Sequence, residues 1–184
     1  FRRDIRTRTF NLSYFYIFNK SVNVLHSIFS GVNKDQRSAG TVLGGLTTEW
    51  HRMEADSSIV PASSSDFFNA EAQIVSFDQY GLGISCGYSY LFVLPSNWLI
   101  FLSAAPGIGL SFKNINAETI SYKPSNIWQV TLNADIQIGY NGTRFYALIS
   151  SMNTWFRSSL NYGNAGSSNS LKFKLTLGWK LQKQ

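Results

Sequence analysis

The chain has 184 residues, of which 44% are hydrophobic and 15% aromatic but only 14% charged, with a formal net charge of +6. Soluble domains carry charge on about a quarter of their residues, so this depletion is hard to reconcile with a surface that faces water. No run approaches about 18 uninterrupted apolar residues, which excludes a transmembrane helix. The basic residues are scattered, and no basic helix or stripe interleaved with aromatic residues indicates nucleic-acid binding.

The first third of the chain predicts three strands. Residues 9–18 alternate large apolar with polar side chains, and a period of two indicates a strand because successive side chains leave opposite faces. After a short turn at 19–21 we expect a mixed strand over 22–30 and a third strand over 40–53. The Ser-, Ala- and Asp-rich residues 54–76 break the alternation and predict a long loop.

The longest alternating segment, 77–112, predicts a hairpin around a turn at 95–97. Each arm alternates for about 15 residues, whereas strands of soluble domains usually have about 5–6. One face is large and apolar, and the other consists of Gly, Ser and Ala with almost no charge. This arrangement is typical of a transmembrane β-barrel, whose strands need about 9–11 residues to cross the bilayer.

The second half of the chain continues this pattern. In order it predicts a loop at 113–125, a strand at 127–140, an Asn-Gly hairpin turn at 141–142, a strand at 143–156, a loop at 157–170 and a last strand at 171–181. The expected fold is therefore all-β: an antiparallel transmembrane β-barrel with about eight strands in this chain, in one domain over residues 1–184.

The lengths of the connections orient the predicted barrel. Outer-membrane barrels have short periplasmic turns and long outer loops, and counting back from a periplasmic C-terminus places 95–97 and 141–142 in the periplasm. The three long loops then fall outside, and only the short turn at 19–21 is an exception. We expect the outer membrane of a Gram-negative cell, with an export signal preceding Phe1, because the first residues have no apolar signal segment.

Tryptophan positions give a second indication of the membrane. The predicted lipid-interface anchors are Trp50, Trp98, Trp128, Trp155 and Trp179. The first, third and fourth of these lie near predicted outer strand ends, and the other two lie near periplasmic ends. Aromatic girdles occupy both interfaces of outer-membrane barrels. The alternative is that tryptophan is simply common in strands.

Charge also separates along the chain. Residues 54–78 contain five acidic and no basic residues, whereas the expected periplasmic side carries Arg2, Arg3, Arg6, Arg8, Lys34, Arg37, Lys180 and Lys183. Exposed charges of this kind usually only solvate loops and ends. The alternative is that the basic residues meet an acidic periplasmic partner or lipid phosphate.

Two groups of polar residues are candidates for function. The predicted lumen face carries Glu49, Asp135, Lys172, Lys174 and Lys180, which either fill a narrow barrel with paired side chains or line a basic, anion-preferring pore. His51 and Glu49 lie two apart on one predicted face and form a candidate base and orienter for a Ser nucleophile from another strand. Such a pair is more often structural. The histidines and the single cysteine form no metal-ligand pattern, and we expect no cofactor.

Several segments resemble an uncharacterised family of outer-membrane barrels from the Bacteroidota, the domain of unknown function 4421. They are Phe1-Arg2-Arg3-Asp4-Ile5-Arg6-Thr7, Tyr16-Ile17-Phe18-Asn19, Gln36-Arg37-Ser38-Ala39-Gly40 with Leu43-Gly44-Gly45, Asp56-Ser57-Ser58-Ile59-Val60-Pro61, and Pro106-Gly107-Ile108-Gly109-Leu110. The resemblance implies further strands before Phe1, so that this chain is the C-terminal part of a barrel of about twelve strands. It implies no catalytic residues.

Three functions follow as hypotheses. The first is a non-enzymatic integral outer-membrane protein, an accessory or structural subunit of a larger envelope assembly, whose partners are outer-membrane lipid and other outer-membrane or periplasmic proteins. The second is a channel for small or anionic solutes. The third is an outer-membrane hydrolase or acyltransferase that uses His51 and Glu49.

Overall fold

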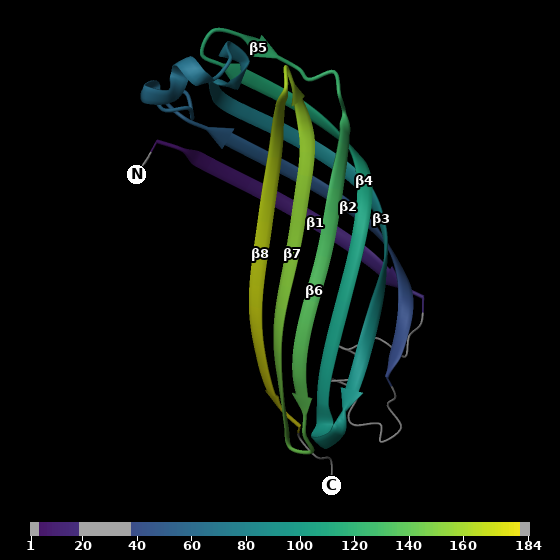
Figure 1. Cartoon of the computed structure of the whole chain (residues 1–184). Helices are drawn as coiled ribbons and strands as arrows, with labels where there is room; N and C mark the ends of the chain where they lie inside the picture. The colour runs from purple at the N-terminus through teal and green to yellow at the C-terminus, as the bar shows by residue number, and fades with distance from the viewer. Residues whose placement is uncertain (1–3, 19–37, 181–184) are drawn as a thin grey trace.

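The computed structural model describes residues 4–18 and 38–180, which form one antiparallel sheet (Figure 1). Its strands are β1 (Arg6–Ile17), β2 (Ala39–Glu54), β3 (Ile74–Leu94), β4 (Trp98–Ala117), β5 (Ser121–Tyr122), β6 (Trp128–Asn141), β7 (Phe145–Asn161) and β8 (Asn164–Trp179). The order in the sheet is β1-β2-β3-β4-β6-β7-β8, and the short β5 pairs with β4. The predicted all-β, antiparallel fold is confirmed.

The sheet curls into a half-barrel with a convex and a concave face (Figure 1). One end, here called the turn end, holds the short connections at Pro95–Asn97 and 142–144. The other end, here called the loop end, holds residues 55–73, with the 3-10 helices η2 (Ala62–Phe67) and η3 (Ala70–Ala72), and residues 118–127. No helix within the described ranges is long and apolar enough to span a membrane.

The two faces differ in side-chain size, as the alternation predicts. The convex face exposes large apolar residues along every long strand, whereas the concave face of β3 and β4 carries mostly Gly, Ser and Ala. Backbones approach closely there: a Cβ on Gly109 would lie 2.5 Å from the carbonyl oxygen of Leu82. Small residues therefore let this part of the sheet bend tightly toward its concave face.

The predicted strand at 22–30 and the turn at 19–21 lie outside the described residues. β1 pairs directly with β2 in one register from Arg6–Glu54 to Ile17–Leu43. Both ends of the connecting segment therefore lie at the turn end, and Ser38 Oγ accepts a hydrogen bond from the Val93 N–H there. We expected Arg6 and Arg8 at the same end as the short turns, because we counted a strand at 22–30 between the strands at 9–18 and 40–53. β1 and β2 instead pair directly and run in opposite directions, so Arg6 and Arg8 lie at the loop end.

Three predicted connections are shorter than expected. The loop at 157–170 was predicted wrongly: β7 and β8 continue to Asn161 and Asn164 around a tight turn with positive φ at Asn161, Tyr162 and Gly163. The adjoining ends of β7 and β8 are rich in Ser and Asn, and they resemble a loop because apolar and polar residues do not alternate there. β3 begins at Ile74, inside the loop predicted at 54–76, and β4 extends into the one predicted at 113–125.

The hairpin between β6 and β7 also differs from its prediction. Asn141 pairs with Tyr146, so the connection is longer than a two-residue Asn-Gly turn, and Asn141 and Gly142 do not have positive φ. Aromatic contacts hold it instead: the Tyr140 ring lies 5.3 Å from that of Phe145. With this connection the odd-numbered residues of β7 lie on the convex face, because Ile149 pairs with Ile138, which is a convex residue of β6.

The concave face contains an apolar cluster near each end. At the turn end Leu91, Leu99, Phe101 and Leu148 are buried together, and Tyr146 packs against them. At the loop end the buried cluster comprises Ile74, Ile115 and Leu160, with Met53, Phe77 and Tyr122 packed on it. Both clusters join β3 and β4 to β7, two strands away from β4 in the sheet, so the curl brings these walls into contact across the interior.

Candidate functional site

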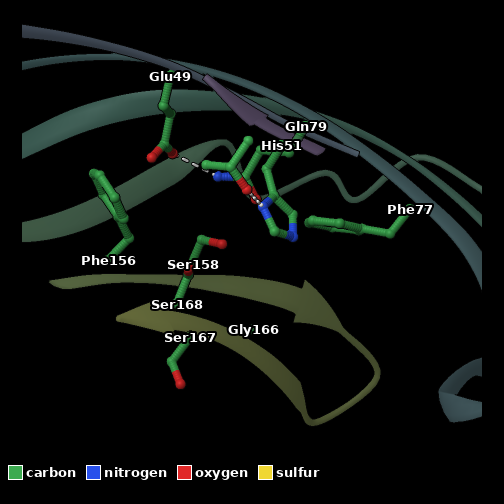
Figure 2. Close-up of a pocket in the computed structure, with 10 residues that line it drawn as sticks. Glu49, His51, Phe77, Gln79, Phe156, Ser158, Gly166, Ser167 and Ser168 are labelled. Carbon is green, nitrogen blue, oxygen red and sulfur yellow. Dashed lines mark hydrogen bonds between the residues drawn. The ribbon is translucent and has the colours of Figure 1, made fainter. Parts of the chain in front are cut away.

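A pocket lies on the concave side near the loop end, between two walls of the curled sheet (Figure 2). Thr9, Glu49, His51, Phe77 and Gln79 from β1, β2 and β3 line one wall, and Phe156, Ser158, Gly166, Ser167 and Ser168 from β7 and β8 line the other. The pocket encloses about 80 Å³. That is far below the roughly 300–1,000 Å³ of pockets for drug-sized ligands, so it has room only for a very small molecule or a few waters.

A chain of side-chain amides holds Glu49 in this pocket. Gln79 Nε2 donates a hydrogen bond to Glu49 Oε1 at 2.7 Å and lies 3.4 Å from Gln129 Oε1. All three side chains are buried on the concave face of adjacent or near-adjacent strands. A Cβ on Gly81 would lie 2.6 Å from the Glu49 carboxylate, so a larger residue there would displace the Glu49 side chain. The carboxylate is thereby fixed in position and turned into the interior.

Lys113 adds a buried positive charge to the same region of the interior. Its Nζ donates to the Ser159 carbonyl oxygen on β7 at 2.9 Å and lies 3.5 Å from that of Asn126. Only 4% of Lys113 is exposed. Because buried charges are retained when they are paired or hydrogen-bonded, Lys113 acts as a tie between β4 and β7.

His51 and Glu49 share the pocket but do not form a catalytic pair. The Thr9 hydroxyl lies 2.9 Å from His51 Nδ1, directly across the β1–β2 ladder, whereas Glu49 bonds to Gln79. The His51 ring also packs 5.8 Å from Phe77. Ser158 projects from the opposite wall into the space before His51 (Figure 2). A base, a hydroxyl and a carboxylate are thus near one another, but the carboxylate does not orient the histidine.

The other predicted lumen residues are distributed along the concave face. Gln137 Nε2 donates to Asp135 Oδ2 at 2.6 Å, and Lys180 Nζ donates to Asn141 Oδ1 at 2.6 Å at the turn end. Lys172 and Lys174 are exposed on the concave side of β8, which is an edge strand of the described sheet. Asp135 and the pocket residue Glu49 are therefore separate, hydrogen-bonded sites rather than parts of one cluster.

The predicted tryptophan anchors are on or near the convex face at different levels. Trp98 and Trp128 begin β4 and β6, and Trp179 ends β8. Trp50 and Trp155 lie several residues inside their strands, so strand ends alone do not explain their positions. Trp50 stacks on Tyr80 with ring centroids 6.4 Å apart, and its Nε1 donates to Asp78 Oδ1 at 2.9 Å.

Charges gather beyond these aromatic residues at the loop end. Arg8 and Arg52 face each other across the β1–β2 ladder, and Arg6 faces Glu54. Arg52 donates two hydrogen bonds to Glu54 Oε1, from Nε at 3.0 Å and from Nη2 at 2.5 Å. These bonds, and then the charge of Arg52, hold the pKa of Glu54 below its ordinary value. The described ranges contain no group of three His, Cys, Asp or Glu residues able to hold a metal.

The sequence model of the family described as Domain of unknown function (DUF4421) matches residues 1–180. The chain belongs to this family. No curated protein and no solved structure matches it significantly. The predicted family resemblance is confirmed, and the DUF4421 chain has a barrel-like fold, with no function attached to the family description.

Several residues of the DUF4421 pocket were not predicted from the sequence. Gln79 lines the pocket and binds Glu49, Gln129 and Lys113 are buried in the interior beside it, and Phe77 and Phe156 supply its aromatic walls. The concave parity of β2, β3 and β6 does place Glu49, Gln79 and Gln129 on one face. What alternation alone does not reveal is the curl that brings Phe156 and Ser158 of β7 opposite them.

Proposed function

We propose that the DUF4421 chain forms the wall of an integral outer-membrane β-barrel that is closed to solute flow and serves as a structural or accessory subunit of a larger envelope assembly. The observation that carries this proposal is the course of the convex apolar residues across the sheet. On β1 they run from Phe10 to Phe18, and on β8 they run from Leu171 to Trp179. Each stretch covers about the nine residues that a tilted strand needs to cross a bilayer.

The two stretches are displaced along the sheet as a tilted barrel requires. Tyr14, the middle of the stretch on β1, lies in a row of paired residues that continues through Leu46, Ile84, Ile108, Val130 and Arg157 to Ser167. The middle of the stretch on β8 is Leu175, eight residues beyond Ser167 toward the turn end. A slide of about 1.3 residues per strand, at about 3.3 Å rise and 4.8 Å spacing, gives a tilt of roughly 40°. Membrane barrels have tilts of about 35–45°.

The strands between follow the same line, here called the band midline. A uniform slide predicts midpoints near residue 87 on β3, 104 on β4 and 135 on β6. The convex apolar stretches there run from Tyr80 to Leu94, from Trp98 to Phe112 and from Trp128 to Tyr140, so their middles fall within about one and a half residues of this line. A packed protein layer has no reason to follow such a line, whereas a flat hydrocarbon slab does.

The interior supports a closed rather than a conducting barrel. Apolar clusters join β3 and β4 to β7 near both ends, and apolar constrictions exclude water and ions from pores. At the loop end, Asn69 Nδ2 also donates to the Tyr162 carbonyl oxygen, and Asn164 Nδ2 donates to Asn69 Oδ1. Residues 55–73 therefore reach from β2 and β3 across the mouth to the β7–β8 turn. Among the described residues, the exposed Lys172 and Lys174 are what favours the channel hypothesis.

The enzyme hypothesis receives less support from the site. Glu49 accepts a hydrogen bond from Gln79, and His51 Nδ1 shares a hydrogen bond with Thr9. Glu49 therefore does not orient His51 as a general base. A hydroxyl nucleophile needs a base that a third group orients. We therefore propose a structural role for both residues, and expect lipid profiles to be unchanged when His51 and Glu49 are replaced by Ala.

Spin-label accessibility tests the membrane placement. In a Cys86→Ser background, single labels are placed at Tyr14→Cys, Leu175→Cys, Ser167→Cys and Ser150→Cys of the intact protein in lipid vesicles. Tyr14 and Leu175 lie on the band midline, so we expect both labels to collide with oxygen and to be protected from a water-soluble nickel complex. Ser167 shares the row of Tyr14 but lies beyond the band, so the nickel complex should reach it.

Ser150 serves as the control, because it lies at midline height on the concave face. Its label should not show the oxygen contact of the lipid-facing pair. The proposal is wrong if the labels at Tyr14 and Leu175 are open to the nickel complex, or if both are shielded from oxygen as in a packed interior. Equal accessibility at Tyr14 and Ser167 would refute the tilt.

The subunit role is supported by an exposed apolar site on the acidic loop. Phe67 is 86% exposed and Phe68 is 51% exposed at the end of η2, beside Asp66. Adjacent exposed aromatic residues of this kind are typical anchors at protein interfaces.

Affinity purification of the intact protein in mild detergent tests this role. The unmodified protein should retain partners that the double variant Phe67→Ser, Phe68→Ser loses, because the aromatic anchors supply apolar contact area at the interface. Ile120→Ser, in the other connection at the loop end, is the control and should retain them. A protein that purifies without partners, or a double variant that keeps all of them, would contradict the role of this loop.

A further inference from the structure

On three strands an arginine lies two positions beyond an aromatic residue, on the convex face and toward the loop end. The pairs are Phe10 and Arg8 on β1, Trp50 and Arg52 on β2, and Trp155 and Arg157 on β7. At the turn end the positions beyond Trp98 and Tyr140 are Ser96 and Gly142 instead. At these described positions the arrangement therefore occurs at the loop end and not at the turn end.

The three arginines lie at nearly one height above the band midline. By the uniform slide, Arg8, Arg52 and Arg157 are about six to seven residues from it. At a tilt of roughly 40° this distance corresponds to about 15–18 Å along the membrane normal, whereas the hydrocarbon ends about 15 Å from its middle. β1 and β7 are five steps apart in the sheet, and both place an arginine guanidinium at the level where lipid phosphates lie.

The partners of these arginines within the protein differ. Arg52 faces Asp78 across the β2–β3 ladder, and its guanidinium is occupied by Glu54. Arg8 and Arg157 are exposed, and neither makes a hydrogen bond or ion pair with a described residue. Arg8 also stands directly opposite Arg52, and Glu54, which is bonded to Arg52, offsets this like-charge cross-strand pair without forming an ion pair with Arg8.

We propose that Arg8 and Arg157 bind phosphate groups of the lipid in the leaflet at the loop end. This inference rests on the proposed membrane placement and adds a ligand to it. A guanidinium presents parallel N–H donors that match two phosphate oxygens, and all three positions carry arginine rather than lysine. Solvation of a charged loop would not require one height on distant strands. The aromatic residue below and the phosphate contact above would together fix the depth of the barrel.

The test uses quenching of tryptophan fluorescence by brominated lipids, with the intact protein in phosphatidylcholine vesicles that contain brominated phosphatidic acid or brominated phosphatidylcholine. Trp50 and Trp155 lie next to the proposed sites and report lipid contact. The protein should prefer the phosphate monoester lipid. Arg8→Gln and Arg157→Gln should each lower this preference about fivefold, the fold-change that corresponds to about 1 kcal/mol for one basic residue at an anionic surface.

Two matched controls should keep the preference. The double substitution Arg52→Gln, Glu54→Gln removes a guanidinium together with the carboxylate that neutralises it, and Arg144→Gln removes a guanidinium at the turn end. Arg8→Lys retains the charge without the planar fork and should lose part of the preference, which separates phosphate recognition from charge alone. These exposed substitutions leave the packed interior unchanged.

The outcomes distinguish the proposed phosphate sites from the proposed membrane placement on which they rest. If neither brominated lipid quenches the tryptophans, the membrane placement itself fails. If both quench equally, or if Arg8→Gln and Arg157→Gln behave as Arg144→Gln does, the placement stands and the phosphate sites are refuted. Displacement of phosphatidic acid by inorganic phosphate in the buffer would also overturn the lipid as the source of the phosphate.

Discussion

Glycine on the concave face of β3 and β4 serves close backbone approach rather than an unusual φ. A Cβ at Gly109 would meet only backbone atoms: the Leu82 carbonyl oxygen at 2.5 Å, Gly83 Cα at 2.8 Å and the Leu82 carbonyl carbon at 3.1 Å. Backbone atoms in a ladder cannot move aside as a side chain can. Gly44, on the convex face, has only the Phe18 ring at 3.7 Å.

We therefore expect Gly109→Ala to destabilise the protein by about 1–3 kcal/mol, the range for inserting a carbon into a well-packed site. Gly44→Ala should change stability by less than about 0.5 kcal/mol, as surface substitutions usually do. Urea unfolding in lipid vesicles or detergent micelles measures both. An equal effect of the two substitutions would mean that the close approach of β3 and β4 does not constrain the sheet.

At the level of single elements, the sequence predicts the strands that cross the apolar band far better than those that extend beyond it. Strand 77–94 and its hairpin partner are found as expected because large and small residues alternate through the whole crossing. The ends of β7 and β8 were missed because Arg157 to Ser167 lie beyond the band, where the convex face is polar and Leu160 is the apolar residue that the concave face adds to the loop-end cluster. In that region large apolar and small or polar residues do not alternate regularly, so the sequence does not show the period of two that identifies a strand.

The pocket illustrates a second limit of element-level prediction. Parity assigns Glu49 and His51 to one concave face, and the structure places them there. The identities of their partners depend on register: Thr9 faces His51 only because β1 pairs with β2 without a strand between them. Counting one strand between the segments that form β1 and β2 is enough to invert the end of the barrel at which Arg6 and Arg8 are expected.

For the whole molecule, the number of long strands limits how the barrel can close. The seven long strands within residues 4–18 and 38–180 alternate in direction, so β1 and β8 both run from the loop end to the turn end. Direct pairing of β1 with β8, or with β8 of a second copy in the same orientation, would be parallel. An entirely antiparallel barrel therefore requires an odd number of strands besides these seven, which gives the even total of bacterial outer-membrane barrels.

The proposed closure of the interior leads to a prediction about conduction by the intact barrel. Ion flow along the described wall would have to pass Phe101 and Leu148 at the turn end and Ile115 and Leu160 at the loop end, all within apolar clusters that bridge the interior. Apolar constrictions of this kind oppose wetting, so we expect no stable open state in planar bilayers. The polar middle of the concave face then serves to fill and tie the barrel, as Lys113 does between β4 and β7.

Single-channel recording with the purified protein measures this directly, and the charge variants Lys172→Glu and Lys174→Glu supply the discriminating comparison. In a closed barrel these variants should be as silent as the unmodified protein, because the apolar clusters and not the lysines prevent flow. A stable conductance with anion preference that weakens in both variants would instead establish the basic wall of β8 as a pore lining. That result would reject the structural role while leaving the membrane placement intact, since the convex band does not depend on the state of the lumen.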